Sequence, residues 1–406
     1  MATIRRIEIP ATMTAQKVSA EVDTRPQTLP AHRLRWWSGL VLLAVSVVPS
    51  VVIGTKFLRH SEPCLVDKPS TNCVAFLPGD ASSATKSVRT GTLESNKHKG
   101  DVLFVTIGLQ SLNDLTLDMA RQEPNLDLYT REQIFGTKSS EEGKKEDLKL
   151  MRYSKDFASY VALRRLGYPV KVTDGGVVVA QLPCSEVAAD AKTCIKPAPA
   201  AAVLQVHDVI TSVGGVEVQT VADLSDTLKT HQPGDKVDLV FKRGSETMNA
   251  SLELIKSSDG DRAIIGFIPD DAPPDTIKFD IPDGVRIESG EIGGPSAGLA
   301  FTLALLDELT PGEITGGVKV AATGEIGLNG QVGAIGGLRQ KTVAVQRAGA
   351  KVFLVPASEV KEAEDQAAGS GLKVIGVDTL DDALNALASL GGNGKDLGKP
   401  GAAIRS

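Results

Sequence analysis

The longest stretch of the chain without a charged residue runs from Trp36 to Thr55. As a helix, its 20 residues would cross the hydrocarbon core of a bilayer, which is about 30 Å thick. Two tryptophans begin the run, and indole rings favour the headgroup region. The pattern therefore predicts a transmembrane helix over 36–55. One alternative is a cleaved signal peptide, although the polar segment 1–35 is longer than a signal peptide normally places before its apolar run. The other is a buried core helix, which the charged residues on both sides disfavour.

Positive charges on the two sides of this run predict its orientation. Only Lys56 and Arg59 follow it closely, whereas six cations precede it: Arg5, Arg6, Lys17, Arg25, Arg33 and Arg35. Loops rich in lysine and arginine stay on the cytoplasmic side of a membrane. Residues 1–35 are therefore expected to be a cytoplasmic tail, and everything after Thr55 is expected to lie outside the cell membrane.

Polar residues dominate the first segment beyond the predicted span. Residues 56–100 are rich in serine, lysine and glycine, with one apolar patch at Val74–Leu77, so this segment is expected to be an extracytoplasmic spacer. Residues 101–108 (DVLFVTIG) are mostly β-branched or apolar and end in glycine, which predicts a buried strand.

Two helices and a charged loop are expected after this strand. The pattern suggests a helix near 113–121. Apolar residues with helical spacing predict another over Met151–Leu166, where Gly167 ends it. The charged run between them, 137–148, is expected to be an exposed loop.

Residues 172–256 form a second unit of strand-like segments, one short helix and a final hairpin. In order they are VVVAQL, the sequence LQVHDVI at 204–210, a helix near 221–230, and the alternating VDLVF that follows Pro233–Gly234. This order resembles a PDZ domain, although His207 stands where that family usually has glycine and a cysteine-bounded loop looks inserted. The resemblance implies a peptide bound as an added strand, with its C-terminal carboxylate on backbone amides. The alternative is a spacer or packing module.

Length and composition limit the broad class of the protein. A chain of 406 residues suggests two or three domains. With 42% hydrophobic and 23% charged residues, it has an ordinary globular composition. A net charge of −6 and short basic clusters without interleaved aromatics give no reason to expect a nucleic-acid partner.

The four cysteines agree with an extracytoplasmic location. Cys64 and Cys73 are nine residues apart, and Cys184 and Cys194 are ten apart. Four cysteines allow three pairings, of which the two local ones are the simplest. Disulfides form and persist outside the cytosol, so both pairs are disulfide candidates.

The chemistry is concentrated in the last third of the chain. Gly293–Gly298 reads GGPSAG and leads into an apolar run that Pro311 and Gly312 end. Proline is favoured at the first helical position, which would make Gly294 the cap and Ser296 the second helical residue, on the apolar face. The alternative role of a helix cap is disfavoured because Ser296 lies too late in the run. A hydroxyl beside a helix N-terminus has amide donors nearby for an oxyanion, so Ser296 is a candidate nucleophile.

A lysine is the remaining candidate base for this serine. No histidine follows His231, all four cysteines lie upstream, and no H-E-x-x-H motif offers zinc ligands. Lys341 follows Gly336–Gly337 and shares one helical face with Leu338 and Val345. Burial on that face would lower its pKa and make it a neutral base near pH 7. The alternative is a lysine whose ammonium group reaches out to water.

These two motifs together resemble a known family. GGPSAG and the segment TGEIGLNGQVGAIGGLRQKTVAVQRAGAKVFLVP at 323–356 are similar to the proteolytic domain of Lon-type proteases. The resemblance implies that Ser296 is the nucleophile, that Lys341 is the base, and that Thr323 orients the lysine. It also implies assembly of copies of the chain into a ring. The chain contains no G-x-x-x-x-G-K-[ST] loop, so an ATPase module is not expected.

The sequence thus predicts an α+β protein resembling the ATP-independent, PDZ-containing Lon-like proteins of Gram-positive bacteria. The expected catalytic region comprises 101–171 and a Lon-type proteolytic domain at 257–390, with the PDZ-like unit inserted between them and a flexible tail at 391–406. The predicted activity is that of a serine endopeptidase acting on unfolded or exposed protein segments without a cofactor or metal. Amides near Gly294 and Ala297 are the oxyanion-hole candidates.

Two other functions fit the same pattern. One is a membrane-tethered PDZ adaptor on a non-catalytic protease fold, which the intact Ser296, Lys341 and Thr323 disfavour. The other is a protease dedicated to one membrane or envelope protein, and the sequence does not separate dedicated from general proteolysis.

Overall fold

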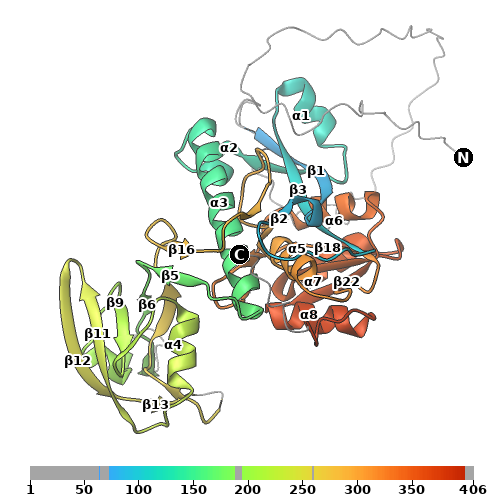
Figure 1. Cartoon of the computed structure of the whole chain (residues 1–406). Helices are drawn as coiled ribbons and strands as arrows, with labels where there is room; N and C mark the ends of the chain where they lie inside the picture. Colours follow the sequence, from blue (N-terminus) through green and yellow to red (C-terminus); the bar gives the residue numbers. More distant parts are fainter. Residues whose placement is uncertain (1–63, 65–72, 188–193, 258–259, 398–406) are drawn as a thin grey trace, which may run out of the picture. The chain divides into compact units, whose positions relative to one another are not determined.

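The computed structural model describes Cys64 and residues 73–187, 194–257 and 260–397 (Figure 1). It mixes helices and strands, as predicted. Its central sheet has the strand order β22-β21-β18-β3-β1-β4, and neighbouring strands among β3, β18, β21 and β22 run parallel. The strands are β1 Cys73–Ser83, β3 Asp101–Ser111, β4 Asp127–Thr130, β18 Lys319–Ala322, β21 Val352–Pro356 and β22 Lys373–Val377. The predicted strand at 101–108 is confirmed in β3, whereas β1 lies within the segment expected to be a spacer.

The two faces of this sheet carry different helices. Strand residues alternate between faces, so Phe104 and Leu354 pack in the same core as α5 (Gly298–Leu309), whereas Phe353 packs in the core with α6 (Leu338–Arg347). Helix α5 is buried on all sides, as expected for a helix that is apolar all round. Helices α7 (Val360–Ala367) and α8 (Leu380–Ser389) complete this part of the chain. Because α5 and α6 cover opposite faces of the sheet, the segment that leads into α5 can meet α6 only beyond the end of a strand.

Helix α3 differs from its prediction. It spans Ser140–Arg165 and includes most of the charged run expected to be a loop. The expectation failed because Ser139 and Glu142 form a capping box, in which each side chain accepts a hydrogen bond from the backbone amide of the other residue. The predicted helix over Met151–Leu166 is the C-terminal half of α3, and Gly167 follows with φ +80°. Its buried face packs with α5 in one core.

A separate domain interrupts the chain after α3. Its sheet has the order β12-β11-β9-β6-β15, with β10 beside β9, and its core is distinct from that around α5. The elements are β6 Val177–Gln181, β9 Val209–Val213, β10 Val216–Glu217, α4 Val221–Leu228, β11 Lys236–Arg243, β12 Glu246–Glu253 and β15 Ile268–Asp271. Strand β15 lies beyond residue 256, which the sequence suggested as the end of this domain. His207 has φ +74°, the left-handed conformation that explains why glycine is usual at this position.

Short strand pairs connect these parts. Strands β5 (Lys171–Thr173) and β16 (Lys278–Asp280) pair antiparallel on either side of the interrupting domain, so the chain leaves and returns at one place. The other pairs are β2 Val88–Thr90 with β17 Val285–Ile287, β7 Cys184–Val187 with β8 Cys194–Pro197, β13 Ile255–Lys256 with β14 Ala263–Ile264, and β19 Glu325–Ile326 with β20 Val332–Gly333.

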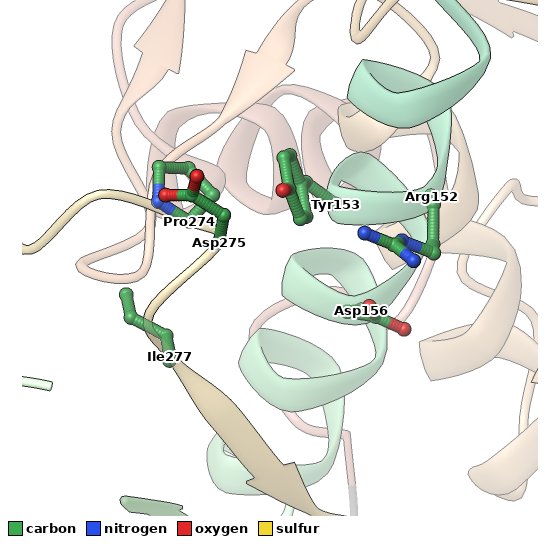
Figure 2. Close-up of a pocket in the computed structure, with 6 residues that line it drawn as sticks. All are labelled: Arg152, Tyr153, Asp156, Pro274, Asp275 and Ile277. Atoms are coloured by element: carbon green, nitrogen blue, oxygen red, sulfur yellow. The ribbon is translucent and has the colours of Figure 1, made fainter. Parts of the chain in front are cut away.

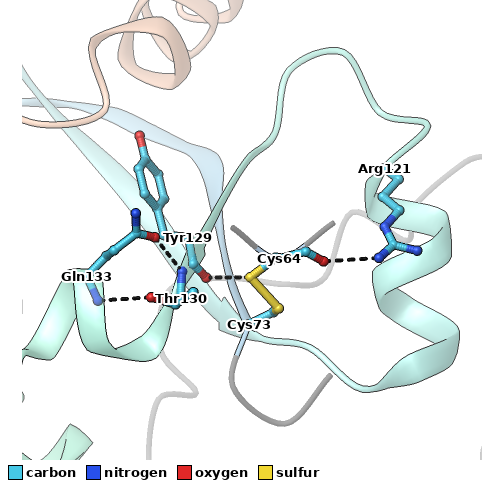
Figure 3. Close-up of a disulfide and its surroundings, with 6 residues drawn as sticks. All are labelled: Cys64, Cys73, Arg121, Tyr129, Thr130 and Gln133. Atoms are coloured by element: carbon cyan, nitrogen blue, oxygen red, sulfur yellow. Dashed lines mark hydrogen bonds between the residues drawn. A yellow bond between two sulfur atoms is a disulfide. The ribbon is translucent and has the colours of Figure 1, made fainter. Parts of the chain in front are cut away.

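The chain divides into two compact units, and the smaller one contains a disulfide between Cys64 and Cys73, as predicted. Figure 3 shows this bridge, with the guanidinium of Arg121 donating to the carbonyl oxygen of Cys64 at 3.0 Å. The same unit contains α1 (Asp114–Ala120), which confirms the helix expected near 113–121, and α2 (Arg131–Phe135). Cys184, in the interrupting domain, is also disulfide-bonded. The side chain of Cys194 lies outside the described ones, so its pairing stays a prediction.

The predicted membrane span cannot be placed in this fold. Residues 36–55 lie outside the described part of the chain. Among the described residues, no helix is both long and apolar enough to cross a bilayer.

Candidate active site

Ser296 lies in a turn directly before α5 rather than inside the helix. The helix begins at Gly298 with Ala297 as its cap, which corrects the expectation that Ser296 is the second helical residue. The cause is the carbonyl oxygen of Ser296, which accepts from the amide of Gly324 at 2.9 Å and from the hydroxyl of Thr323 at 3.1 Å. These bonds hold the serine backbone at the end of β18 and keep it out of the helix.

Gly298 explains why the motif needs a glycine immediately after Ala297. A Cβ at this position would lie 2.8 Å from a side-chain carbon of Ile326 and 2.9 Å from its amide nitrogen. Real Cβ atoms do not approach backbone so closely, so only glycine lets the first turn of α5 contact β19. This contact keeps Ser296 beside the strand end.

Thr323 joins the serine to the lysine. It is the first residue after β18 and is fully buried, and its amide donates to the carbonyl of Leu354 at 3.0 Å. Its hydroxyl donates to the carbonyl of Ser296 and accepts from Nζ of Lys341 at 3.2 Å. One side chain thus fixes both the serine backbone and the lysine head group.

Lys341 extends from α6 to the serine. Gly337 caps this helix in the left-handed conformation, with φ 67°. The lysine side chain is buried, with 2% of the residue exposed, so the alternative of an ammonium group in water is wrong. Nζ donates to Oγ of Ser296 at 2.9 Å. The candidate nucleophile and the candidate base are thus within hydrogen-bonding distance, as covalent catalysis by a serine requires.

Burial controls the charge of this lysine. It lowers the pKa of Lys341 to about 7, against the opposing effects of Glu359 and Glu325. Burial also raises the pKa of each of these carboxyl groups, and the positive charge of Lys341 opposes that shift. Near neutral pH a substantial fraction of Lys341 is therefore neutral and able to accept a proton.

The two oxyanion-hole candidates differ in their surroundings. The amide of Gly294 donates to the backbone carbonyl of Asp147 in α3 at 2.8 Å, so in this structure it is already engaged. Ala297 is buried and directly follows the serine.

Sequence reasoning missed the contribution of α3 to this site. Ser154 donates to the carbonyl of Pro295 at 2.9 Å, and Asp147 accepts from Gly294, so α3 holds both residues before Ser296. Asp147 lay in the segment expected to be a loop. The S-x-x-E pattern at Ser139–Glu142 is the signal that could have revealed the helix.

Two other polar features do not include Ser296, Thr323 or Lys341. A pocket of about 260 Å³ lies between α3 and the segment leading into β16 (Figure 2), lined by Arg152, Tyr153, Asp156, Pro274, Asp275 and Ile277. The other is a cluster of His98, Asp307 and Glu313, whose ligand atoms lie within 4.8 Å of one another.

Hydrogen bonds within the protein explain this cluster better than a metal site does. His98 Nδ1 lies 2.8 Å from the carbonyl oxygen of Gly312, and Asp307 accepts from the amide of Ile314. Glu313 accepts from the amides of Lys99 and Gly100. These bonds already connect the segment before β3 to the loop after α5.

Replacing Thr323 with valine should lower kcat about tenfold, because the change removes a hydrogen bond to Nζ of Lys341 and another to the serine backbone while preserving volume. The matched control is Thr342→Val, since the buried Thr342 hydroxyl donates only within α6, to Leu338 at 2.8 Å. Steady-state kinetics on a protein substrate would compare the two. Equal effects of both substitutions would contradict a specific role for Thr323.

Comparisons with known proteins identify two domains in the chain. Residues 210–389 match the family model of the Lon protease (S16) C-terminal proteolytic domain, and residues 165–254 match that of the PDZ domain. The shared range, 210–254, lies in the interrupting domain.

The individual relatives are Lon proteases. A Lon protease of Trichlorobacter lovleyi is 35% identical over 180 residues, covering 43% of this chain and 20% of the relative. A Lon protease of Haemophilus influenzae is 38% identical over 110 residues, covering 27% of this chain and 13% of the relative. The chain thus spans about a fifth or less of the length of these curated relatives.

Solved structures of PDZ domains also match part of the chain. The PDZ domain of the SdrC-like protein of Listeria monocytogenes is 24% identical, with a TM-score of 0.19, and the match covers 23% of this chain and 86% of that structure. The two family models and the Lon relatives together show that the chain contains a PDZ domain and a Lon-type proteolytic domain.

Proposed function

We propose that the chain is an ATP-independent serine endopeptidase with a Ser296–Lys341 dyad that cleaves unfolded or exposed protein segments. The observation that carries this proposal is the 2.9 Å contact between Nζ of Lys341 and Oγ of Ser296, made by a buried lysine with a pKa of about 7. A neutral amine at this distance can accept the serine proton when the hydroxyl attacks.

The reaction would proceed in two halves. Oγ of Ser296 attacks the scissile carbonyl carbon while Nζ of Lys341 takes its proton, and the amide of Ala297 is the proposed donor to the oxyanion. The tetrahedral intermediate then breaks its C–N bond, and Lys341 returns the proton to the leaving amine. Water next attacks the acyl carbon and gives a proton to Nζ of Lys341. The C–O bond to Ser296 then breaks and the acid leaves, while Lys341 returns the proton to Oγ of Ser296.

The PDZ domain offers a place for substrate recruitment. Strand β15 ends its sheet, and in the described part of the chain no strand pairs with its outer edge. Helix α4 lies beside β15, because the amide of Val221 donates to a carboxylate oxygen of Asp271 at 2.7 Å. We propose that an extended peptide, such as a protein C-terminus, adds to this edge as a further strand.

Location, energy source and assembly are also proposals. The uncharged run at 36–55 and its flanking charges support one membrane anchor, with the catalytic domain on the outer side of the cell membrane. The absence of a G-x-x-x-x-G-K-[ST] loop in the sequence supports proteolysis without ATP. Assembly into a homo-oligomeric ring rests on the resemblance to Lon-type domains alone.

The full 406-residue chain, purified in detergent micelles, should cleave casein, which is unfolded, after apyrase has removed all nucleotide. The same rate is expected with added ATP and Mg²⁺, and Ser296→Ala should abolish cleavage. The measurement is the fluorescence released from casein that carries quenched fluorophores. Cleavage that requires ATP would overturn the energy-independent proposal, and no cleavage under either condition would favour the non-catalytic adaptor.

A further inference from the structure

Helix α3 contacts the backbone that leads into the nucleophile. Ser154, with 5% of its surface exposed, donates to the carbonyl of Pro295 at 2.9 Å, and Asp147 accepts from the amide of Gly294. A Cβ added to Gly293 would lie 2.6 Å from Cβ of Asp147, so the chain passes tightly against the helix. The loop before Ser296 is therefore held from one side by α3, whereas Thr323 and Gly324 hold the serine carbonyl from β18.

The other end of α3 is bound to the PDZ domain. Arg164 forms ion pairs with Asp223 and Asp226 of α4, each at 3.0 Å. The hydroxyl of Tyr160, one turn earlier, accepts from the same guanidinium at 2.7 Å. The side chains of Arg164 and Asp223 are half-buried, and these ion pairs join α3 to the PDZ domain.

A single rigid element connects the two contacts. Ser154 and Arg164 are ten residues apart on α3, a distance of about 15 Å along a helix. Between them, Ala158, Ala162 and Leu163 are fully buried in the core that also contains α5. The same helix is thus attached to α4 through Arg164 and to the backbone of Pro295 through Ser154. Helix α4 also lies beside the free edge of β15, where the proposed peptide would bind.

We propose that Ser154 is a positioning residue for Ser296, and that α3 links this positioning through Arg164 to helix α4 of the PDZ domain. This inference rests on the proposed function and adds a regulatory element to it. Peptide occupancy of the PDZ domain thereby changes the geometry of the nucleophile without any contact between the peptide and the active site.

Two pairs of variants of the full chain test the two ends of α3. Ser154→Ala is matched by Ser159→Ala, because the buried Ser159 hydroxyl donates only to Lys155 in the same helix. Arg164→Ala is matched by Arg165→Ala, because Arg165 pairs with Asp381 of α8 rather than with the PDZ domain. On casein, we expect Ser154→Ala to lower kcat about tenfold with KM unchanged, and Arg164→Ala to lower kcat about threefold. Both controls should stay within about twofold of wild type.

A double-mutant cycle tests the link itself. Effects at sites this far apart normally multiply, so independent sites would retain the full threefold loss from Arg164→Ala in the Ser154→Ala background. The proposal expects that loss to shrink to about 1.5-fold, because the contact through which Arg164 acts is already gone. Multiplicative effects, or a Ser154→Ala variant no slower than Ser159→Ala, would overturn it.

Hydrogen exchange provides a readout that does not depend on turnover. Peptides covering 288–298, analysed by mass spectrometry, contain the Gly294 amide that Asp147 protects. Faster exchange in Ser154→Ala and Arg164→Ala, but not in the two controls, is expected. Unchanged exchange in Arg164→Ala would overturn the link even if the wild-type chain proved inactive. Failure of the proposed peptidase activity would instead appear as an inactive wild type with the expected exchange pattern intact.

Discussion

Replacing Lys341 with methionine is expected to lower kcat for casein cleavage by about 10⁴-fold, and Ser296→Ala should have an effect of similar size. Nζ of Lys341 lies 2.9 Å from the serine hydroxyl and is the only base that the structure places beside it among the described residues. Without that amine the hydroxyl keeps its proton, and little remains except binding and oxyanion stabilisation. Because the two residues act as one unit, the double variant should be no slower than either single variant.

The control for this prediction is Lys361→Met, which removes a lysine that is 83% exposed and pairs with Asp365 in α7. Its kcat should equal that of wild type.

In the wild-type enzyme, kcat/KM should fall as the pH drops through the pKa of Lys341, about 7, because protonation removes the base. A Lys341→Met variant that kept a hundredth of wild-type activity would contradict the dyad.

Local signals in the sequence made Ser296 and Lys341 candidates one by one, and the resemblance to Lon-type domains joined them as nucleophile and base. Gly293–Gly298 combines a proline and glycines with an apolar run, and Lys341 falls on the apolar stripe of its helix. These patterns depend on helical periodicity, which a single sequence displays. The structure adds the bridge through Thr323, which depends on where β18 ends relative to α5 and α6.

The start of α5 could not be predicted in the same way. Local preference placed Pro295 at the first helical position, but the carbonyl of Ser296 bonds to Gly324 instead of continuing a helix. That competing partner is 28 residues away in sequence, so tertiary contacts overrode the local preference. The same limit hid Ser154, because its acceptor is the carbonyl of Pro295, 141 residues further along the chain.

Helix α3 shows a different kind of failure. Its first turns are charged and largely exposed, so hydrophobic periodicity gives no signal there, and the segment was expected to be a loop. Capping by Ser139 and Glu142 begins the helix, and a local motif of this kind was readable in the sequence.

The second large effect concerns stability, and it follows from the same lysine. An unfolded lysine has a pKa of 10.5, whereas burial in the folded chain lowers it to about 7. Between these values the unfolded state binds more protons than the folded state, so the free energy of unfolding rises with pH across this window. At pH 7 the buried lysine therefore lowers the free energy of unfolding. The penalty is of the order of 4 kcal/mol, since one pKa unit corresponds to about 1.4 kcal/mol.

Lys341→Met should therefore stabilise the protein at pH 7 while abolishing its activity. The loss of two hydrogen bonds offsets about half of the gain, which leaves a net increase of about 2 kcal/mol and a rise in Tm of about 5 °C. Calorimetry at pH 7 and pH 10 would measure it, with Lys361→Met as the control, and the advantage of Lys341→Met should disappear or reverse at pH 10. A variant that is less stable than wild type at pH 7 would mean that the buried lysine is charged and paired, most directly with Glu359 or Glu325, and could not serve as the resting base. In the proposed dyad, the base and the destabilising residue are the same side chain, so selection for activity would retain a buried amine that selection for stability would remove.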